Sequence, residues 1–133
     1  MIIGIGTDLL DIARVRSILE QPAGERFLQR VLTPAERELA AARRGRLAEF
    51  TAGRFAAKEA VVKALGCGIG KEVGLHDIEV LPDAKGKPHC RLSEAALQRL
   101  AEGGTDVRGL IVHLSITHSD TAAMAYAMAE RRG

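Results

Sequence analysis

The side chains best suited to chemistry lie in an apolar stretch between Arg54 and Ala64. Glu59 and Lys63 are four positions apart there, so a helix would place them side by side on one face. In an apolar helix, a carboxylate beside an ammonium needs either solvent or a chemical role. As a merely solvated pair it would stabilise the helix by roughly 0.3 kcal/mol. A second charged stretch, at the N-terminus, favours the chemical role.

That stretch opens the chain and is rich in isoleucine. It predicts a short buried strand that ends at Asp8, with Gly4, Gly6 and Asp8 on the same face. Glycines at such positions allow another backbone or a ligand to approach closely. Asp11 is expected to cap a helix over residues 12–20, which leaves Asp8 without a structural role.

Two segments carry a resemblance to a known family, GIGTDLLDIARV at residues 4–15 and GRFAAKEAVVKAL at residues 53–65. Their spacing, the chain length, and the later segments GKP (86–88) and SITHSD (115–120) also fit. Together they resemble the holo-[acyl-carrier-protein] synthases, the small phosphopantetheinyl transferases. The resemblance implies Mg²⁺-dependent transfer of the 4′-phosphopantetheine arm of coenzyme A to a serine of an apo acyl carrier protein. The second product would be adenosine 3′,5′-bisphosphate.

The resemblance also implies a catalytic group of Asp8, Glu59 and Lys63. Asp8 and Glu59 would be the metal ligands, provided that the strand packs against the helix. Mg²⁺ commonly takes one or two carboxylates together with phosphate oxygens and water. Lys63 would hold the diphosphate and stabilise the departing bisphosphate. The base that accepts the serine proton is left open between Asp8, Glu59 and a water on the metal.

Four residues are implied to bind coenzyme A: Arg54, Lys58, Lys63 and His118. Lys58 points to another side of the helix than Glu59 and is placed near the nucleotide phosphates. His118 is implied to contact the 3′-phosphate, although the sequence alone fits a polar turn residue equally well. A small basic cluster could also contact a phosphate, while stabilisation of the end of the preceding helix is its simpler explanation. The cluster consists of Arg43, Arg44 and Arg46.

The implied protein partner is an acidic acyl carrier protein, which a basic first helix would meet. Arg14 is the main candidate for this contact and Arg26 supports it. Their effect would appear mainly as a salt-sensitive association rate. Simple solvation of a helix face is the alternative explanation for each arginine.

Assembly is a further expectation from the resemblance, because small family members typically form trimers with active sites between subunits. We expect a homotrimer in which His118 or nearby residues of a neighbour complete the site of Asp8 and Glu59. Met124 and Tyr126, together with Met128, share one side of the final strand. They could supply an apolar interface or belong to the monomer core.

The pattern of apolar residues predicts an α+β fold, a single domain over residues 1–133 with a largely antiparallel sheet packed against helices. The resemblance implies the 4′-phosphopantetheinyl transferase fold. Thr33, Pro34 and Glu36 predict a capped helix start, and Gly66 is expected to end the long central helix. Helices are expected at 12–20, 25–32, 33–44, 47–65 and after Ser93, and strands at the N-terminus, 75–81, 87–92, 108–117 and 121–129.

Composition excludes several classes of function. A net charge of +2 and 3% aromatic residues argue against nucleic acid binding. No apolar run approaches 18 residues and no leader is apparent, so we expect no membrane contact. Cys67 and Cys90 show no pairing framework, which is typical of reduced thiols. A cytoplasmic enzyme is expected, and the resemblance places it in fatty acid biosynthesis.

Two other classes of function fit parts of the pattern. A Mg²⁺-dependent hydrolase of a nucleotide diphosphate would use the same carboxylates and Lys63 but no carrier protein. A non-catalytic basic module for RNA or an acidic partner is the second alternative. Turnover would exclude the binding module, and release of bisphosphate without a carrier would favour the hydrolase.

Overall fold

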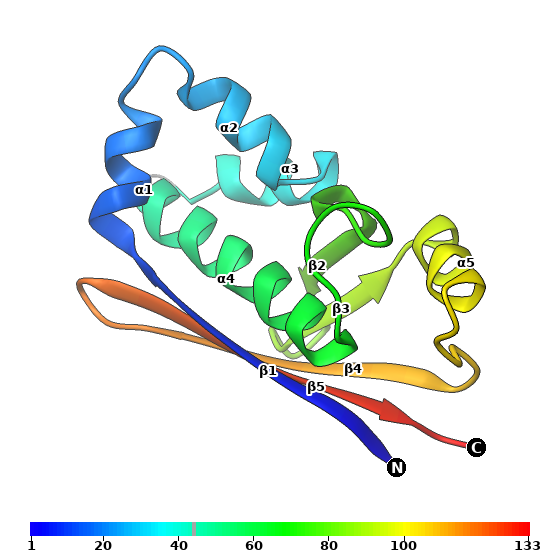
Figure 1. Cartoon of the computed structure of the whole chain (residues 1–133). Coiled ribbons are helices and arrows are strands. Elements are labelled where there is room, and N and C mark those ends of the chain that lie inside the picture. Colours follow the sequence, from blue (N-terminus) through cyan, green and yellow to red (C-terminus); the bar gives the residue numbers. More distant parts are fainter. Residues whose placement is uncertain (44) are drawn as a thin grey trace.

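The computed structural model describes residues 1–43 and 45–133 (Figure 1). Its larger sheet has three antiparallel strands in the order β1 (Ile2–Asp11), β5 (Ala122–Arg131) and β4 (Leu110–His118). The long helix α4 (Leu47–Leu65) lies across one face of this sheet, and no element in the described part of the chain covers the other face. Arg44, which the sequence places in a basic cluster, lies outside the described residues.

Three short helices surround the N-terminal half of the central helix (Figure 1). The backbone N–H of Ala13 donates to the Asp11 carboxylate at 3.0 Å, which confirms the predicted cap of the first helix. The predicted capping box between Thr33 and Glu36 is also present. These helices are α1 (Ile12–Leu19), α2 (Gly24–Val31) and α3 (Pro34–Ala41).

A smaller two-stranded hairpin and a short helix complete the fold. The strand predicted over 75–81 begins later, because Leu75–Asp77 forms a 3₁₀ turn, η1. The cause is local: the Asp77 carboxylate accepts the Gly74 backbone N–H at 2.8 Å and closes the turn. The remaining elements are β2 (Ile78–Pro82), β3 (Pro88–Leu92) and α5 (Glu94–Glu102).

Helix α4 packs closely against β1 because of two glycines. An added Cβ would lie 1.8 Å from the Ala64 carbonyl oxygen at Gly4, and 1.9 Å from the Ala60 carbonyl oxygen at Gly6. No larger residue fits at either position, so the predicted close approach to another backbone is confirmed. The helix ends at Gly66, whose φ of 81° is left-handed, as predicted.

The outer face of the large sheet is exposed, so the expectation of a buried first strand is wrong for this face. Ile5 and Leu9 are 55% and 69% exposed, because none of the described elements covers this face. Met124 and Tyr126 of β5 are each 38% exposed on the same face, opposite Leu9 and Thr7 in the register. They are therefore not part of the monomer core, one of the two alternatives that the sequence left open.

No helix within residues 1–43 or 45–133 is both long enough and apolar enough to cross a membrane.

Candidate active site

The crossing of β1 and α4 brings the three expected catalytic residues together. The ammonium nitrogen of Lys63 lies 3.2 Å from Oδ1 of Asp8 and donates to the Thr7 carbonyl oxygen at 3.0 Å. Glu59 lies one turn before Lys63 on the same helix face. Asp8 lies inside β1, which continues to Asp11, and not at the strand end as the sequence suggested.

The electrostatics of this group favour a bound cation. Partial burial raises the pKa of Glu59, and the neighbouring Asp8 carboxylate raises it further. Lys63 opposes these two effects. Two carboxylates that repel each other when both are ionised are a natural site for a divalent ion, since the ion removes that repulsion.

The donor set fits Mg²⁺ better than a metal that needs a cage of protein ligands. No group of three or more His, Cys, Asp or Glu side chains that could hold a metal occurs within the described part of the chain. Mg²⁺ accepts one or two carboxylates and completes its shell with water and substrate phosphate oxygens. A cavity of about 450 Å³, to which Asp8 and Lys63 but not Glu59 contribute, leaves room for such ligands. It is lined by Thr7, Asp8, Leu9, Lys63 and Met124.

A second pocket, of about 170 Å³, lies at the N-terminal end of α4 and has the character of an anion site. Three arginines and one histidine contribute to its walls, so cationic donors predominate over its single carboxylate. The lining residues are Arg43, Arg46, Glu49, Phe50, Gly53, Arg54, Ile116 and His118. We call this the arginine pocket.

Arg54 and His118, both expected at coenzyme A, are fixed by defined partners in the arginine pocket. Nε of Arg54 donates to the Val80 carbonyl oxygen at 3.1 Å, and its guanidinium carbon lies 4.4 Å from the centre of the Phe50 ring. Burial lowers the pKa of Arg54 from its ordinary value. Nε2 of His118 lies 2.6 Å from the Glu49 carboxylate.

The two sites lie on opposite sides of α4. Arg54 and Lys63 are nine positions apart, and at 3.6 residues per turn their side chains project about 180° from one another. The two pockets share no lining residue among those described. A ligand bound to a single chain therefore does not contact both pockets without passing around the helix.

The sequence and the fold are both similar to those of known proteins. The family model of the 4′-phosphopantetheinyl transferase superfamily matches residues 4–126. The chain belongs to this superfamily. It is 44% identical to a holo-[acyl-carrier-protein] synthase of Geobacillus kaustophilus, over all of this chain and 92% of the relative. The expected family and the expected α+β fold are confirmed.

Solved structures of family members superpose over nearly the whole chain. A holo-(acyl-carrier-protein) synthase from Bacillus anthracis, in complex with CoA (3′,5′-ADP), gives a TM-score of 0.81 at 44% identity. The superposition covers 99% of each chain. The synthase from Neisseria meningitidis gives 0.83 at 36% identity, over 98% of this chain and 100% of that one.

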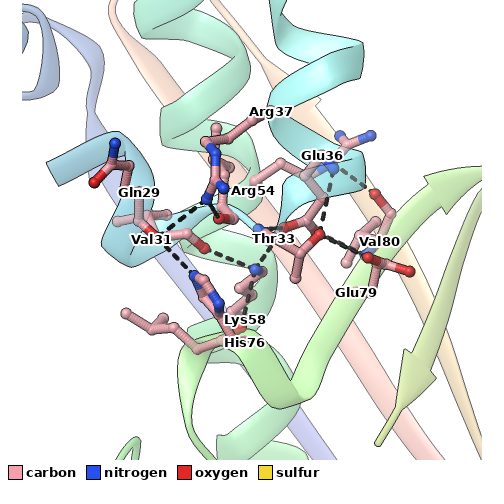
Figure 2. A network of polar contacts seen from close by, with 12 residues as sticks. Gln29, Val31, Thr33, Glu36, Arg37, Arg54, Lys58, His76, Glu79 and Val80 are labelled. Atoms are coloured by element: carbon pink, nitrogen blue, oxygen red, sulfur yellow. Dashed lines mark hydrogen bonds and ion pairs between the residues drawn. The ribbon is translucent and has the colours of Figure 1, made fainter. Parts of the chain in front are cut away.

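Lys58 corrects one expectation about the family motif. Its side chain is fully buried, and its ammonium donates to the Glu36 carboxylate at 2.6 Å (Figure 2). Burial lowers the pKa of Lys58, while Glu36 acts in the opposite direction. An ammonium enclosed in this way does not reach nucleotide phosphates, so the structure contradicts the expected contact. Lys58 does point to a different side of α4 from Glu59, as expected.

Arg14 and Arg26, the residues expected to bind the carrier, are exposed on α1 and α2. Neither forms an ion pair with any of residues 1–43 or 45–133. Both guanidinium groups are therefore available to an acidic partner surface.

The pairing of two acidic residues was not predicted from the sequence. Glu49 pairs with His118 across 69 positions, and Glu36 pairs with Lys58 across 22. Glu36 had a local signal, the capping box, which explains its position in the helix but not its buried ion pair. Glu49 had no signal, since its partner comes from the end of β4.

Proposed function

We propose that this chain is a holo-[acyl-carrier-protein] synthase. It transfers 4′-phosphopantetheine from coenzyme A to a serine of apo acyl carrier protein and releases adenosine 3′,5′-bisphosphate. The observation that carries the proposal is the grouping of Asp8, Glu59 and Lys63 where β1 crosses α4. Relatives that bear this name match the chain along its whole length.

The reaction forms one phosphorus–oxygen bond and breaks another. The carrier serine oxygen attacks the β-phosphorus of coenzyme A, the serine loses its proton, and the bond to the departing bisphosphate breaks. Asp8 and Glu59 would hold Mg²⁺, which supplies positive charge to the diphosphate oxygens. Lys63 holds the diphosphate and stabilises the negative charge on the departing phosphate.

The arginine pocket would bind the nucleotide end of coenzyme A. Guanidinium groups match phosphate oxygens through paired hydrogen bonds. Arg54 and His118 are the side chains we assign to this contact, with His118 at the 3′-phosphate. Its present partner, Glu49, marks a place where an anionic oxygen is accepted.

A homotrimer would bring the two sites together. Within one chain α4 separates Lys63 from Arg54, so a ligand that contacts both requires a second copy. The uncovered sheet face with Ile5, Leu9 and Tyr126 offers an apolar surface for that copy. We infer that the metal site of one subunit meets the arginine pocket of the next.

Arg14 and Arg26 would guide the acidic carrier protein to this site. Exposed charges change mainly the association rate and its dependence on salt. The holo carrier is the form that carries acyl chains, so we assign the enzyme to fatty acid biosynthesis in the cytoplasm.

Intact-protein mass spectrometry tests the proposed function. An apo acyl carrier protein is incubated with this protein, coenzyme A and Mg²⁺, with and without a chelator. The expected result is a mass gain equal to phosphopantetheine that disappears with the chelator. Release of bisphosphate with an unmodified carrier would instead indicate a hydrolase, and no reaction with several carriers would contradict transfer altogether.

A further inference from the structure

Among residues 1–43 and 45–133, the most enclosed charged side chains are those of Lys58 and Glu36. They form an ion pair of 2.6 Å, and both side chains are 0% exposed. Lys58 uses its other two hydrogens on backbone oxygens, donating to Val31 at 2.7 Å and Leu75 at 2.9 Å. The ammonium therefore has three acceptors and no donor capacity left. The pair joins α4 to α3, to the end of α2 and to η1.

The carboxylate of Glu36 connects the ion pair to β2. Its Oε1 accepts the backbone N–H of Thr33 at 2.8 Å, and its Oε2 accepts the backbone N–H of Val80 at 2.8 Å. The carbonyl of the same Val80 accepts Nε of Arg54 at 3.1 Å. Both polar backbone groups of Val80 are thus held by side chains from α3 and α4, as Figure 2 shows.

This connection fixes Arg54 at its base and leaves its tip available. The bond to Val80 uses only Nε, and the Phe50 ring lies against the guanidinium plane. Neither terminal nitrogen of Arg54 has a hydrogen-bond partner among residues 1–43 and 45–133. The tip belongs to the wall of the arginine pocket. An arginine held in this way loses little side-chain freedom when it binds an anion.

Stability alone is a weak reason for a buried ion pair. The cost of removing two charges from water offsets much of their attraction, and well-packed apolar side chains often serve the fold equally well. The pair does orient the groups around it, because each of its hydrogen bonds has a defined partner. These contacts connect the pair to Arg54 through the backbone of Val80.

We propose that Lys58 and Glu36 are positioning residues for Arg54. Through the backbone of Val80 they keep the terminal nitrogens of Arg54 at the arginine pocket, ready for a phosphate of the nucleotide end of coenzyme A. Neither residue touches the ligand. The inference rests on the proposed function for the identity of the ligand, and it gives the lysine that precedes Glu59 a role of its own.

Binding of adenosine 3′,5′-bisphosphate, measured by calorimetry, tests this inference. Both charges are changed together in E36M/K58M, since a single change would leave one charge buried alone. Arg54→Ala is then introduced into the wild type and into that double variant. In the wild type we expect Arg54→Ala to weaken binding about tenfold or more, as for a lost charge-assisted hydrogen bond. In E36M/K58M, where Arg54 is already misplaced, it should cost less than about threefold.

Two control variants separate positioning from loss of stability. E36Q/K58M keeps an acceptor for the Val80 N–H, so we expect it to recover most of the affinity. Val15→Ala truncates a fully buried side chain in a different cluster, that of Ile12 and Ala52. In that background Arg54→Ala should cost as much as in the wild type, although the melting temperature is lower. An equal tenfold cost of Arg54→Ala in E36M/K58M would show that the pair is only structural.

The wild-type protein alone provides a second measurement in case E36M/K58M does not fold. The Nε–H of Arg54 should exchange slowly with solvent in NMR spectra, because it is bonded to Val80. Rapid exchange of this proton would contradict the geometry on which the inference depends.

Carrier modification distinguishes failure of this inference from failure of the proposed function. If the wild type modifies a carrier while Arg54→Ala binds the bisphosphate normally, the transfer activity stands, and both the Arg54 contact and this inference are wrong. If the wild type neither binds nor modifies, the proposed function and this inference are both wrong.

Discussion

Lys63 of α4 and Asp8 of β1 form an ion pair of 3.2 Å, although 55 positions separate them in the chain. The contact exists because Gly4 and Gly6 let the strand backbone lie against the helix at Ala60 and Ala64. The Lys63 side chain is 51% exposed and that of Asp8 20%, so the pair contributes little to stability. Its position beside Glu59 makes it more important for charge placement than for folding.

The two carboxylates should matter for activity far more than for folding. Asp8→Asn and Glu59→Gln each keep the size of the side chain but remove a charge that would hold the metal. We expect the transfer rate to fall by about 100-fold or more, because the metal supplies several kcal/mol of charge stabilisation. Initial rates from the mass assay at saturating coenzyme A measure this effect.

Thermal melting with and without Mg²⁺ provides the matching control. A ligand that binds only the folded state raises the melting temperature, so Mg²⁺ should stabilise the wild type. It should have little effect on either variant. Near-wild-type turnover in both variants would contradict the assignment of Asp8 and Glu59 as metal ligands.

The raised pKa of Glu59 predicts how stability depends on pH without metal. A carboxyl whose folded pKa lies above its ordinary value of 4.5 favours the fold only while protonated. This contribution is complete below pH 4.5 and is lost as the pH rises through the folded pKa. Glu59→Gln cannot ionise, so its stability relative to the wild type should increase over that interval.

Urea unfolding in the presence of a chelator, at a series of pH values, measures this difference. Glu38→Gln, at an exposed position in α3, is the matched control and should show no comparable trend. A constant difference between Glu59→Gln and the wild type across the series would mean that Glu59 has no raised pKa.

Lys63 should contribute to the chemical step and little to the fold. Lys63→Ala keeps a good helix former at an exposed position, so we expect the free energy of unfolding to change by less than about 1 kcal/mol. The transfer rate should fall about tenfold to 100-fold, because a charge on the departing phosphate loses its partner. Lys63→Arg is the control, and it should recover part of the rate. Unchanged kcat in Lys63→Ala would exclude this role.

Adding a side-chain atom at the glycines of β1 that contact α4 should destabilise the protein. At Gly6 a Cβ would lie 1.9 Å from the Ala60 carbonyl oxygen, so the strand must move away from the helix. We expect Gly6→Ala to destabilise the protein by about 1–3 kcal/mol. It should also lower activity, since Asp8 would move with the strand. Gly68→Ala is the control, because nothing lies within 4 Å of its added Cβ. Equal stability of the two variants in urea unfolding would contradict the close packing.

The exposed sheet face should hold the subunits together. Tyr126→Arg places a charge in the proposed interface, and we expect a lower mass in light scattering together with lost activity. Ala95→Lys, at an exposed position on α5, should leave both unchanged. A wild-type protein that is monomeric at working concentration would contradict the trimer directly.

A mixing experiment shows whether each active site spans two subunits. Lys63→Ala and Arg54→Ala are each expected to be weakly active alone. In mixed trimers, some sites combine an intact Lys63 from one subunit with an intact Arg54 from its neighbour. Activity should therefore rise after the two variants are unfolded and refolded together. If it does not, both residues act within the same chain.

Much of the fold could be predicted from local signals in the sequence. Asp11 and Thr33 begin helices, because their side chains accept backbone N–H groups of the first turn. Gly66 ends a helix, because it adopts the left-handed conformation. The alternation of Gly4, Gly6 and Asp8 likewise placed them on one strand face. Confirmed family membership agrees with the resemblance carried by residues 4–15 and 53–65.

The partners of buried and paired side chains depended on the tertiary structure. Lys58 belongs to the same motif as Glu59, yet its burial against Glu36, Val31 and Leu75 required three other elements to converge. His118 acquired Glu49 in the same way. Local signals act through neighbouring backbone groups, whereas these contacts join segments far apart in the chain. Local sequence signals therefore predicted most of the elements and the candidate catalytic residues, whereas the packing of β1 and β2 around α4 brought distant side chains into contact.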